Sequence, residues 1–247
     1  MSKTVLVTGS AKGIGRAIII ELAKEGYNCI INYNKSEKEA LELKDFIEKS
    51  YNAKALAIKC DISNEFLVMD MFNEIEKTFG GVDVLVNNAA IDLSNLFNKI
   101  EVEDFKKTID TNLIGAFICS RLAFPYMKKN KWGRIINISS TNGINTYFPS
   151  SLAYDASKAA LNSLTHNLAV EFKPYVLVNA ICPGFVGTDS ELKGYDEDFL
   201  KEEEDKILLK RCGTPEEVAH LVKFLASDEA SYINNSIIRI DGGQLNS

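Results

Sequence analysis

Residues 8–15 read Thr-Gly-Ser-Ala-Lys-Gly-Ile-Gly, and what lies on either side of them decides the fold. A short apolar run, Thr4–Thr8, leads into this stretch, and a helical pattern, Arg16–Lys24, follows it. A glycine-rich turn that joins a first strand to a first helix is typical of doubly wound α/β proteins. We therefore expect a Rossmann-type parallel sheet that begins here.

Further runs rich in Val, Ile and Leu alternate with amphipathic stretches along the chain. Near-continuous apolar runs, rather than alternating ones, indicate parallel strands that are buried on both faces. The apolar stripe of Val68, Phe72 and Ile75 is typical of a helix packed on a sheet. We predict a doubly wound parallel sheet of about seven strands with helices on both faces. Besides Thr4–Thr8, strands are expected at Asn28–Tyr33, Ala55–Cys60, Val82–Asn87, Arg134–Ser139, Leu177–Cys182 and Ile237–Ile240.

The chain of 247 residues could form one large α/β domain or two small ones. Strand and helix patterns alternate without a linker, an internal repeat or a low-complexity tract. One domain over residues 1–247 is therefore expected. Its hydrophobic fraction of 46% is ample for a buried core.

Charge and composition exclude several classes of protein. The formal net charge of −6 argues against a nucleic-acid-binding protein that depends on a global positive field. No apolar run approaches the roughly 18 residues that span a bilayer, and the N-terminal residues lack a secretory signal pattern. Five cysteines without a CxxC pair, together with two histidines, predict free thiols and no metal site. We expect a cytoplasmic protein that binds neither nucleic acid nor membrane.

The glycine-rich turn has the features of a dinucleotide-binding loop. A pyrophosphate is bound by backbone N–H groups at a helix N-terminus, where side chains would block its approach. The spacing GxxxGxG is one residue longer than the common GxGxxG, and glycine-rich turns also occur for purely structural reasons. Its position between a first strand and a first helix favours the functional interpretation. The expected binding residues are Gly9, Ser10, Lys12, Gly13, Ile14 and Gly15.

The end of the second expected strand indicates which nicotinamide coenzyme would bind. Sites for NAD usually carry an acid about 20 residues beyond the loop, on the ribose 2′-hydroxyl. Residues 26–36 contain no Asp or Glu and end in Asn34-Lys35-Ser36. Lys12 and Lys35 could instead bind a 2′-phosphate, although both could be merely solvated. We predict NADP(H) rather than NAD(H), with Asn34 and Lys35 at the site.

Tyr154 and Lys158 form a YxxxK pair within a helical pattern. Residues four apart share one helix face, with Cβ atoms about 5–6 Å apart. An unperturbed tyrosine titrates near 10, and a fixed ammonium nearby favours the phenolate and lowers that pKa. Such a pair also occurs by chance on helix surfaces, so its weight comes from the residues that precede it. These are the hydroxyls that end the strand Arg134–Ser139, Asn87-Asn88 at the end of another strand, and Asp110-Thr111-Asn112.

With these motifs in this order, the chain resembles the short-chain dehydrogenase/reductase family over essentially its whole length. The resemblance implies that Tyr154 is the general acid that protonates a carbonyl oxygen during reduction. It implies that Lys158 lowers the tyrosine pKa and binds the nicotinamide ribose, and that Ser140 polarises the substrate carbonyl. Asn112 would support a water-mediated proton relay. The remaining cofactor contacts that the family implies are Asp61, Ile62, Asn88, Ala89, Pro183, Gly184, Val186 and Thr188, together with Tyr154 and Lys158.

The sequence leaves the catalytic hydroxyl open and departs from the family pattern at two places. Aligning the strand selects Ser140 as the catalytic serine, whereas the spacing to the tyrosine that is usual in the family would select Thr141. Ala90 stands where relatives usually have a glycine. Residues 234–236, Asn-Asn-Ser, differ from the Thr-Gly-Gln that is frequent before the last strand.

Within the family, the chain is most similar to the β-ketoacyl-acyl-carrier-protein reductases of fatty-acid synthesis. That similarity implies a substrate bound to an acidic carrier protein, which a basic surface would attract. Lys128, Lys129, Lys131 and Arg134 precede the serine strand, and they suit either carrier docking or a solvated helix end. A substrate lid is expected over about residues 188–211, and nine acids against two lysines in Asp189–Asp205 would repel an acidic carrier.

The sequence leaves two other functions open. One is the reduction or oxidation of a free alcohol, sugar or steroid carbonyl, since the lid and the loop Thr141–Ala153 determine specificity. The other is a cofactor-sensing protein without catalysis, against which the intact Tyr154 and Lys158 argue. The family also implies a homotetramer, packed through helices around Asn112–Lys129 and Ala153–Lys173.

Overall fold

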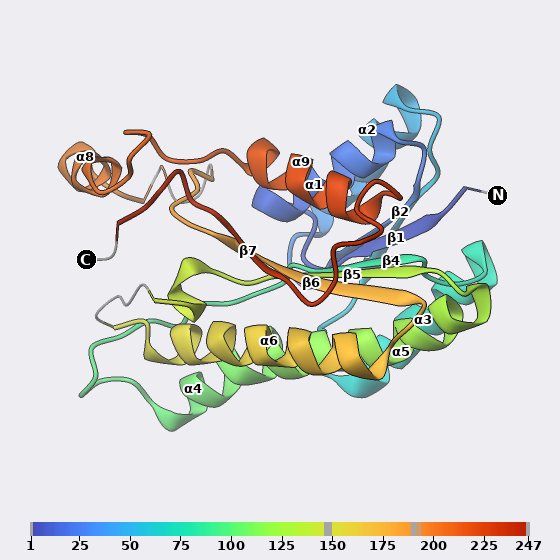
Figure 1. Ribbon diagram of the computed structural model, residues 1–247, viewed down its shortest axis with the longest axis horizontal. Helices are drawn as coiled ribbons and strands as arrows, with labels where there is room; N and C mark the ends of the chain where they lie inside the picture. Colours follow the sequence, from blue (N-terminus) through green and yellow to red (C-terminus); the bar gives the residue numbers. More distant parts are fainter. Residues whose placement is uncertain (1, 146–149, 189–191, 193, 246–247) are drawn as a thin grey trace.

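A computed structural model describes residues 2–145, 150–188, 192 and 194–245. Within these residues, seven parallel strands form one sheet, as predicted, and their order is β3-β2-β1-β4-β5-β6-β7 (Figure 1). Thr4 lies opposite Asn28 in the β1–β2 pair, and Val84 lies opposite Arg134 in the β4–β5 pair. Each following residue of one strand lies opposite the next residue of its partner. The strands are β1 Thr4–Val7, β2 Asn28–Tyr33, β3 Ala55–Lys59, β4 Val84–Asn87, β5 Gly133–Ile138, β6 Val176–Pro183 and β7 Ile237–Ile240.

Helices cover both faces of this sheet. Figure 1 shows α1, α2 and α9 on one face and α3, α4, α5 and α6 on the other. A π-helical turn, Asp110–Ile114, joins α4 to α5, and a 3₁₀ turn, Thr141–Gly143, precedes α6. The helices are α1 Gly13–Lys24, α2 Glu37–Ser50, α3 Glu65–Phe79, α4 Val102–Ile109, α5 Gly115–Asn130, α6 Leu152–Glu171, α8 Glu197–Asp205 and α9 Pro215–Ala226.

Two apolar layers hold the helices to the sheet. Along β1, Val5 and Val7 face the layer beneath α1 and α9, whereas Leu6 faces the layer beneath α3 and α5. All three side chains are fully buried, which explains why both faces of the strand are apolar. Burying a side chain of this size contributes roughly 1.5–3 kcal/mol. The alternation of side chains across the sheet is therefore the source of both layers.

Local capping chemistry fixes several helix ends. Thr214 and Glu217 form the capping box that begins α9, with Pro215 at its first position. Asn64 begins α3 by accepting hydrogen bonds from Phe66 N and Leu67 N. By contrast, α1 begins at Gly13, three residues earlier than the pattern starting at Arg16 predicts. The last glycines of the predicted loop therefore belong to the first helical turn.

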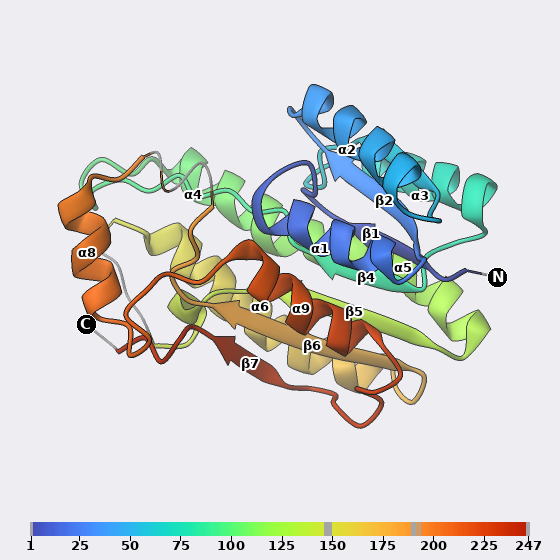
Figure 2. The ribbon, with the colours of Figure 1, turned by 90° about the horizontal axis from the view of Figure 1, so that it is seen from above.

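The site is positioned by the strand order. The chain runs outward from β1 to β3 on one side and from β4 to β7 on the other, so the order reverses between β1 and β4. Ligands of doubly wound sheets bind at such a reversal, beyond the carboxyl ends of the strands. Figure 2 shows α8 beyond this same edge. Of the expected lid, residues 189–191 and 193 lie outside the described residues, as do residues 146–149 of the loop that precedes Tyr154.

Candidate active site

Hydrogen bonds hold the glycine-rich loop against the end of β4. Thr8 Oγ1 accepts hydrogen bonds from Asn88 N at 2.9 Å and from Ala89 N at 3.0 Å, and Asn88 Nδ2 donates to Thr8 O and Gly9 O. Gly9 adopts a φ of +64°, and a Cβ placed there would lie 2.9 Å from Ala89 Cα. Both the left-handed conformation and the close contact therefore require glycine at this position.

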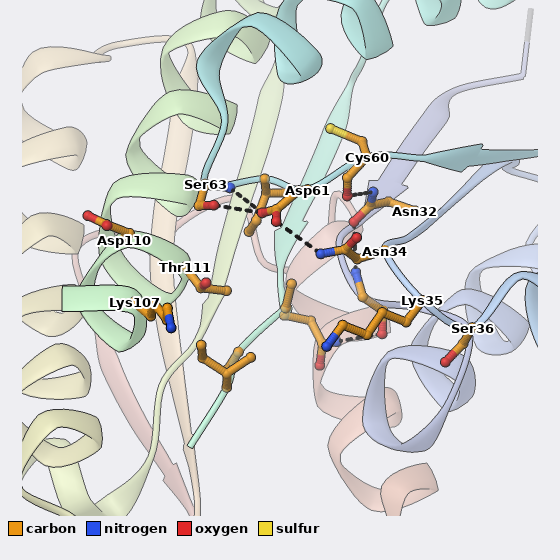
Figure 3. Close-up of a pocket in the computed structure, with 16 residues that line it drawn as sticks. Asn32, Asn34, Lys35, Ser36, Cys60, Asp61, Ser63, Lys107, Asp110 and Thr111 are labelled. Atoms are coloured by element: carbon orange, nitrogen blue, oxygen red, sulfur yellow. Dashed lines mark hydrogen bonds between the residues drawn. The ribbon is translucent and has the colours of Figure 1, made fainter. Parts of the chain in front are cut away.

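A cleft of about 620 Å³ opens beside this loop (Figure 3). Residues from the ends of β2, β3 and β4 form its walls, as expected for a ligand at the strand reversal. Asp61 accepts hydrogen bonds from Asn34 Nδ2 at 3.1 Å and from Ser63 N at 3.0 Å, which links the β2 and β3 ends across the cleft. The sequence-predicted residues that line the cleft are Gly9, Asn34, Lys35, Asp61, Ile62, Asn88 and Ala89.

Lys12 lies elsewhere. It lines a second hollow, of about 710 Å³, together with Gly13 and Thr188, and its Nζ is 2.7 Å from Glu39 Oε1. Lys35 lines the first cleft. The two lysines therefore line different hollows in this structure, and their joint binding of one phosphate stays a prediction. Glu39, in the first turn of α2, determines where the Lys12 ammonium lies.

The other loop residues are packed into the protein. Ser10 is buried, and its Oγ has no hydrogen-bond partner among the described residues. Gly15 is buried in the first turn of α1, where a Cβ would lie 2.5 Å from Asn88 Nδ2. Gly13 has a φ of +55° and leaves an open path beside Thr188, since even an added Cβ would be 3.5 Å from Thr188 Cγ2. Ile14 lies in the same turn and packs against the core. The backbone N–H groups at this helix N-terminus suit a bound dinucleotide pyrophosphate.

The segment after β6 contributes to the second hollow. Pro183 ends the strand and is buried, and Gly184 packs so tightly that a Cβ would lie 2.6 Å from Asp241 Cβ. Val186 pairs with Gly213 in an isolated parallel bridge. Of the four residues predicted here, Thr188 lines the second hollow beside Gly13. The glycine-rich loop thus contributes residues to both hollows.

Tyr154 and Lys158 lie one turn apart on α6, as predicted. Lys158 is buried and its Nζ donates a hydrogen bond of 2.8 Å to Ile138 O, at the end of β5. The same Nζ lies 5.3 Å from the centre of the Tyr154 ring. Burial lowers the pKa of Lys158 from 10.5 to about 8, because desolvation disfavours the charged amine. The amine is thus held close to the phenol, and its pKa of about 8 is well below the usual value for lysine.

Three hydroxylated residues follow β5, and the structure separates them. Ser139 is buried and donates to Lys158 O at 3.1 Å, and Thr141 is buried in the 3₁₀ turn. Ser140 is half-buried, and its Oγ accepts a hydrogen bond from Asn142 N at 3.1 Å. Among these three residues, Ser140 alone is open to solvent. This arrangement favours Ser140 over Thr141 as the residue that meets a substrate.

Asn112 lies in the π-helical turn between α4 and α5 and is buried. Its Oδ1 accepts from Ile91 N at 2.8 Å, and its Nδ2 donates to Ile91 O at 2.9 Å and to Ser157 Oγ at 3.0 Å. Single π turns of this kind are frequent at functional sites. The side chain therefore connects α6 to the segment that follows β4.

Sequence reasoning missed several residues that line the first cleft. Asn32 is buried in β2, where its Oδ1 accepts from Gly9 N at 3.1 Å and its Nδ2 donates to Cys60 O at 3.0 Å. A polar residue inside the apolar run of this strand was a usable signal. Asp110 and Thr111, which the sequence marked only as neighbours of Asn112, also line the cleft, together with residues that no sequence signal marked, among them Cys60, Ser63 and Lys107.

The basic cluster expected to dock a carrier lies far from these groups. Lys128, Lys129 and Lys131 precede β5, whereas Ser140 follows it. Six residues of strand separate the two positions, which corresponds to about 20 Å. Arg134 is buried, and its guanidinium packs 4.3 Å from the centre of the Trp132 ring. In this chain, the cluster is thus at the opposite edge of the sheet from the site.

The described part of the chain shows no metal-binding group of three or more His, Cys, Asp or Glu residues. None of its helices is long and apolar enough to cross a membrane. The five cysteines, all of them described, are unpaired thiols, and four are buried.

Comparison with known proteins identifies the class. A family model described as "Enoyl-(Acyl carrier protein) reductase" matches residues 9–244. The chain belongs to the short-chain dehydrogenase/reductase family, and it is an oxidoreductase that acts on CH–OH groups and their carbonyls with a nicotinamide dinucleotide.

Individual relatives are similar over nearly the whole chain. The 3-oxoacyl-[acyl-carrier-protein] reductase of Staphylococcus epidermidis is 38% identical over 244 residues, covering 98% of this chain and 99% of the relative. The enzyme of the same name from Aquifex aeolicus is 39% identical over 98% of this chain and 96% of its own.

Two solved structures share the fold. The acetoin dehydrogenase YohF of Salmonella typhimurium is 32% identical with a TM-score of 0.89, covering 99% of this chain and 96% of its own. A putative gluconate dehydrogenase from Agrobacterium tumefaciens is also 32% identical, with a TM-score of 0.90, covering 98% of this chain and 95% of its own.

Proposed function

We propose that this protein reduces a 3-oxoacyl group carried by an acyl carrier protein to the 3-hydroxyacyl group, with NADPH as the reductant. The observation that carries the proposal is the similarity of 38–39% to 3-oxoacyl-carrier-protein reductases over nearly the full length of both chains. The match extends through the expected lid and the loop before Tyr154, where substrate specificity is determined in this fold.

The side chains of this chain supply the proton and the orientation. Ser140 donates its hydroxyl hydrogen to the substrate carbonyl, because its oxygen already accepts from Asn142 N. Tyr154 gives its phenolic proton to the same carbonyl oxygen, and the nearby Lys158 ammonium stabilises the phenolate that remains. When bound, the coenzyme supplies the hydride. Asn112 holds the backbone of Ile91 and supports return of a proton to Tyr154 from solvent.

NADP(H) is the proposed coenzyme. Lys35 and Asn34 line the cleft at the end of β2, and residues 26–36 offer no carboxylate to a ribose 2′-hydroxyl. An ammonium in this place favours a 2′-phosphate. The comparison of kcat/KM for NADPH and NADH tests the proposal, and a preference for NADH would refute it.

The aromatic residues around α8 suit an acyl substrate. Tyr195 and Phe199 pack with ring centres 4.5 Å apart, and Phe185, just after β6, lies 6.1 Å from Tyr195. We propose that residues 188–211 act as the substrate lid and that this aromatic cluster contacts the acyl chain. The cluster offers apolar surface beside the residues that follow β6.

A second candidate function is the reduction or oxidation of a small free carbonyl or alcohol. The structural relatives named for acetoin and gluconate favour it, as does the acidic helix α8 at the substrate edge. The position of the basic cluster at the opposite edge removes one argument for docking of an acidic carrier beside the site.

One set of assays separates these functions. NADPH consumption is measured with acetoacetyl carrier protein, with the same acyl group on a small thioester, with an enoyl thioester, and with small hydroxyketones and sugar acids. We expect the highest kcat/KM for the acetoacetyl carrier protein. Reduction of free ketones alone would establish the second candidate, and reduction of the enoyl double bond alone would overturn both.

We also propose a homotetramer formed through α5 and α6. Apolar side chains are exposed on these helices, including Phe117 and Val170. Contact with further copies would bury them. Light scattering after size exclusion tests this, and a species of about 27 kDa would refute it.

A further inference from the structure

Asp155 follows Tyr154 on α6 and accepts two hydrogen bonds on one oxygen. Its Oδ1 accepts from Asn142 Nδ2 at 2.7 Å and from Ser151 Oγ at 2.8 Å. Asn142 belongs to the 3₁₀ turn after β5, and Ser151 is the residue before α6. The carboxylate therefore joins two segments that are separate in the sequence, and both are part of the site.

Asn142 carries this connection to Ser140. Its side chain donates to Asp155, and its backbone N–H donates to Ser140 Oγ at 3.1 Å. The chain of contacts thus runs from Ser140 through Asn142 to Asp155, whose neighbour is Tyr154. The two groups that meet the substrate carbonyl are thus linked through two residues, Asn142 and Asp155, and two hydrogen bonds of 3.1 and 2.7 Å.

The turn is also tied to α6 from behind. Asn162 Nδ2 donates to Gly143 O at 3.0 Å, and a Cβ at Gly143 would lie 2.7 Å from the carbonyl carbon of Lys158. These contacts hold the C-terminal end of the turn against the helix. The contact between Asp155 and Asn142 holds its other end, which is the end that bears Ser140.

We propose that Asp155 is a positioning residue that fixes the Ser140 hydroxyl relative to the Tyr154 phenol. The inference rests on the proposed carbonyl reduction, since it assigns Ser140 and Tyr154 to the same substrate oxygen. Two donors must converge on that oxygen, and a displacement of about 1 Å at such a site can cost a hundredfold in rate. Asp155 itself does not touch the substrate carbonyl in this arrangement.

An acid in the first turn of a helix could instead act solely through the helix dipole. That role would affect stability and would not depend on Asn142. The two roles therefore differ in whether the effects of changing Asp155 and Asn142 are coupled.

The test compares Asp155→Ala with Asp155→Asn in the full-length protein, using NADPH and the best carbonyl substrate. Asp155→Ala removes the acceptor, and we expect kcat to fall roughly tenfold to a hundredfold while the KM for NADPH changes less than twofold. Asp155→Asn keeps an amide oxygen that can accept from both donors, so it is expected to recover most of the rate. Equal losses in both variants would overturn the proposal, because charge rather than the hydrogen bonds would then matter.

Asn142→Ala supplies the second arm, because it removes the side-chain donor and keeps the backbone N–H that contacts Ser140. We expect it to lower kcat as Asp155→Ala does, and the double variant to be no slower than either single one. Multiplicative losses in the double variant would overturn the proposal.

Asp228→Ala is the matched control. Asp228 also accepts hydrogen bonds from a neighbouring segment, among them one of 2.9 Å from Trp132 Nε1, at the opposite edge of the sheet. Its loss is expected to leave kcat unchanged. A fall in kcat equal to that of Asp155→Ala would show general destabilisation and would overturn the positioning role.

Wild-type turnover separates this inference from the proposed function. An inactive wild-type protein would refute the carbonyl reduction and with it the positioning role of Asp155 in that reaction. Active wild type with unimpaired Asp155→Ala would refute the positioning role alone. Thermal unfolding needs no turnover and can be measured for the wild type, Asp155→Ala, Asn142→Ala and the double variant. Additive shifts in their melting temperatures would show that Asp155 and Asn142 are not coupled.

Discussion

The Nζ of Lys158 lies 5.3 Å from the centre of the Tyr154 ring and donates a hydrogen bond to Ile138 O. The same amine therefore lies beside the phenol and binds the end of β5. This contact orients α6 against the strand that delivers Ser140. The buried amine is costly for folding, since its charge is taken out of water.

Tyr154→Phe tests the proton donor. Phenylalanine fills the same space and keeps the packing of α6, but it has no proton to give. We expect kcat for carbonyl reduction to fall by about a hundredfold to ten-thousandfold, which is the usual cost of losing an acid–base group. Coenzyme affinity, measured by NADPH fluorescence, is expected to change little. Turnover near the wild-type level would show that another group donates the proton.

The rate of reduction should depend on the charge of Lys158. Its pKa of about 8 means that the ammonium is lost as the pH rises through 8, and with it the charge that stabilises the phenolate of Tyr154. We expect kcat/KM for reduction to decline above about pH 8. In Lys158→Arg the guanidinium stays charged, so the alkaline decline should move upward or vanish. A decline that remains at pH 8 in this variant would assign it to a different group.

Folding stability should show the cost of the same amine. The folded-state pKa of about 8 lies below the value of 10.5, so the unfolded chain binds more protons between these two pH values. Stability is therefore expected to rise with pH across that window, and the full cost is present below pH 8. Lys158→Met removes the charge at pH 7, and we expect a gain of about 2 kcal/mol after the loss of the hydrogen bond to Ile138 O. Differential scanning calorimetry checks this, and a lower Tm than wild type would contradict it.

Ser140→Ala and Thr141→Ala decide the register of the catalytic hydroxyl. Ser140 is half-buried at the site, whereas Thr141 is buried in the turn. We expect Ser140→Ala to reduce kcat about a hundredfold, because a preorganised donor to the carbonyl oxygen is lost. Thr141→Ala should affect mainly thermal stability. The reverse pattern in steady-state kinetics would place the hydroxyl at Thr141.

The fold could be predicted from the sequence because local residue patterns indicate its strands and helices. Val, Ile and Leu runs mark strands buried on both faces, and β2 and β7 begin and end where they were predicted. The ends that were missed depend on tertiary contacts. Helix α1 begins at Gly13 because the glycine-rich loop turns there, and β4 begins at Val84 rather than Val82 because its register with β1 starts where Val84 lies opposite Val5.

The sequence indicated which residues would form the candidate site, but it did not indicate where their side chains would point. Asn112 was expected in a helix, but its π turn depends on bonds to Ile91 and Ser157 that no local pattern contains. Lys12 and Lys35 were expected to act together, and the position of Lys12 depends on Glu39 in the next helix. Local sequence patterns do not reveal contacts between segments that are far apart in the chain.

Coenzyme preference tests the roles of these two lysines. Lys35 lines the cleft, so Lys35→Ala should weaken NADPH binding tenfold or more and leave NADH binding almost unchanged, since a charge-assisted bond to the 2′-phosphate would be lost. Lys12 is paired with Glu39, and an exposed pair of this kind is weak and easily broken. Glu39→Gln frees the ammonium, and we expect NADPH to bind a few times more tightly while NADH does not.

Glu42→Gln is the matched control, because Glu42 lines the same hollow as Lys12 and Glu39 but makes its ion pair with Lys38. It removes the same charge one helical turn away, so a general change in potential would affect both variants alike. A gain in NADPH affinity in Glu39→Gln alone would mean that the 2′-phosphate takes Lys12 from Glu39 on binding. Equal gains in the two variants, or weaker binding in Glu39→Gln, would show that Lys12 stays with its partner and that Lys35 selects the coenzyme without it.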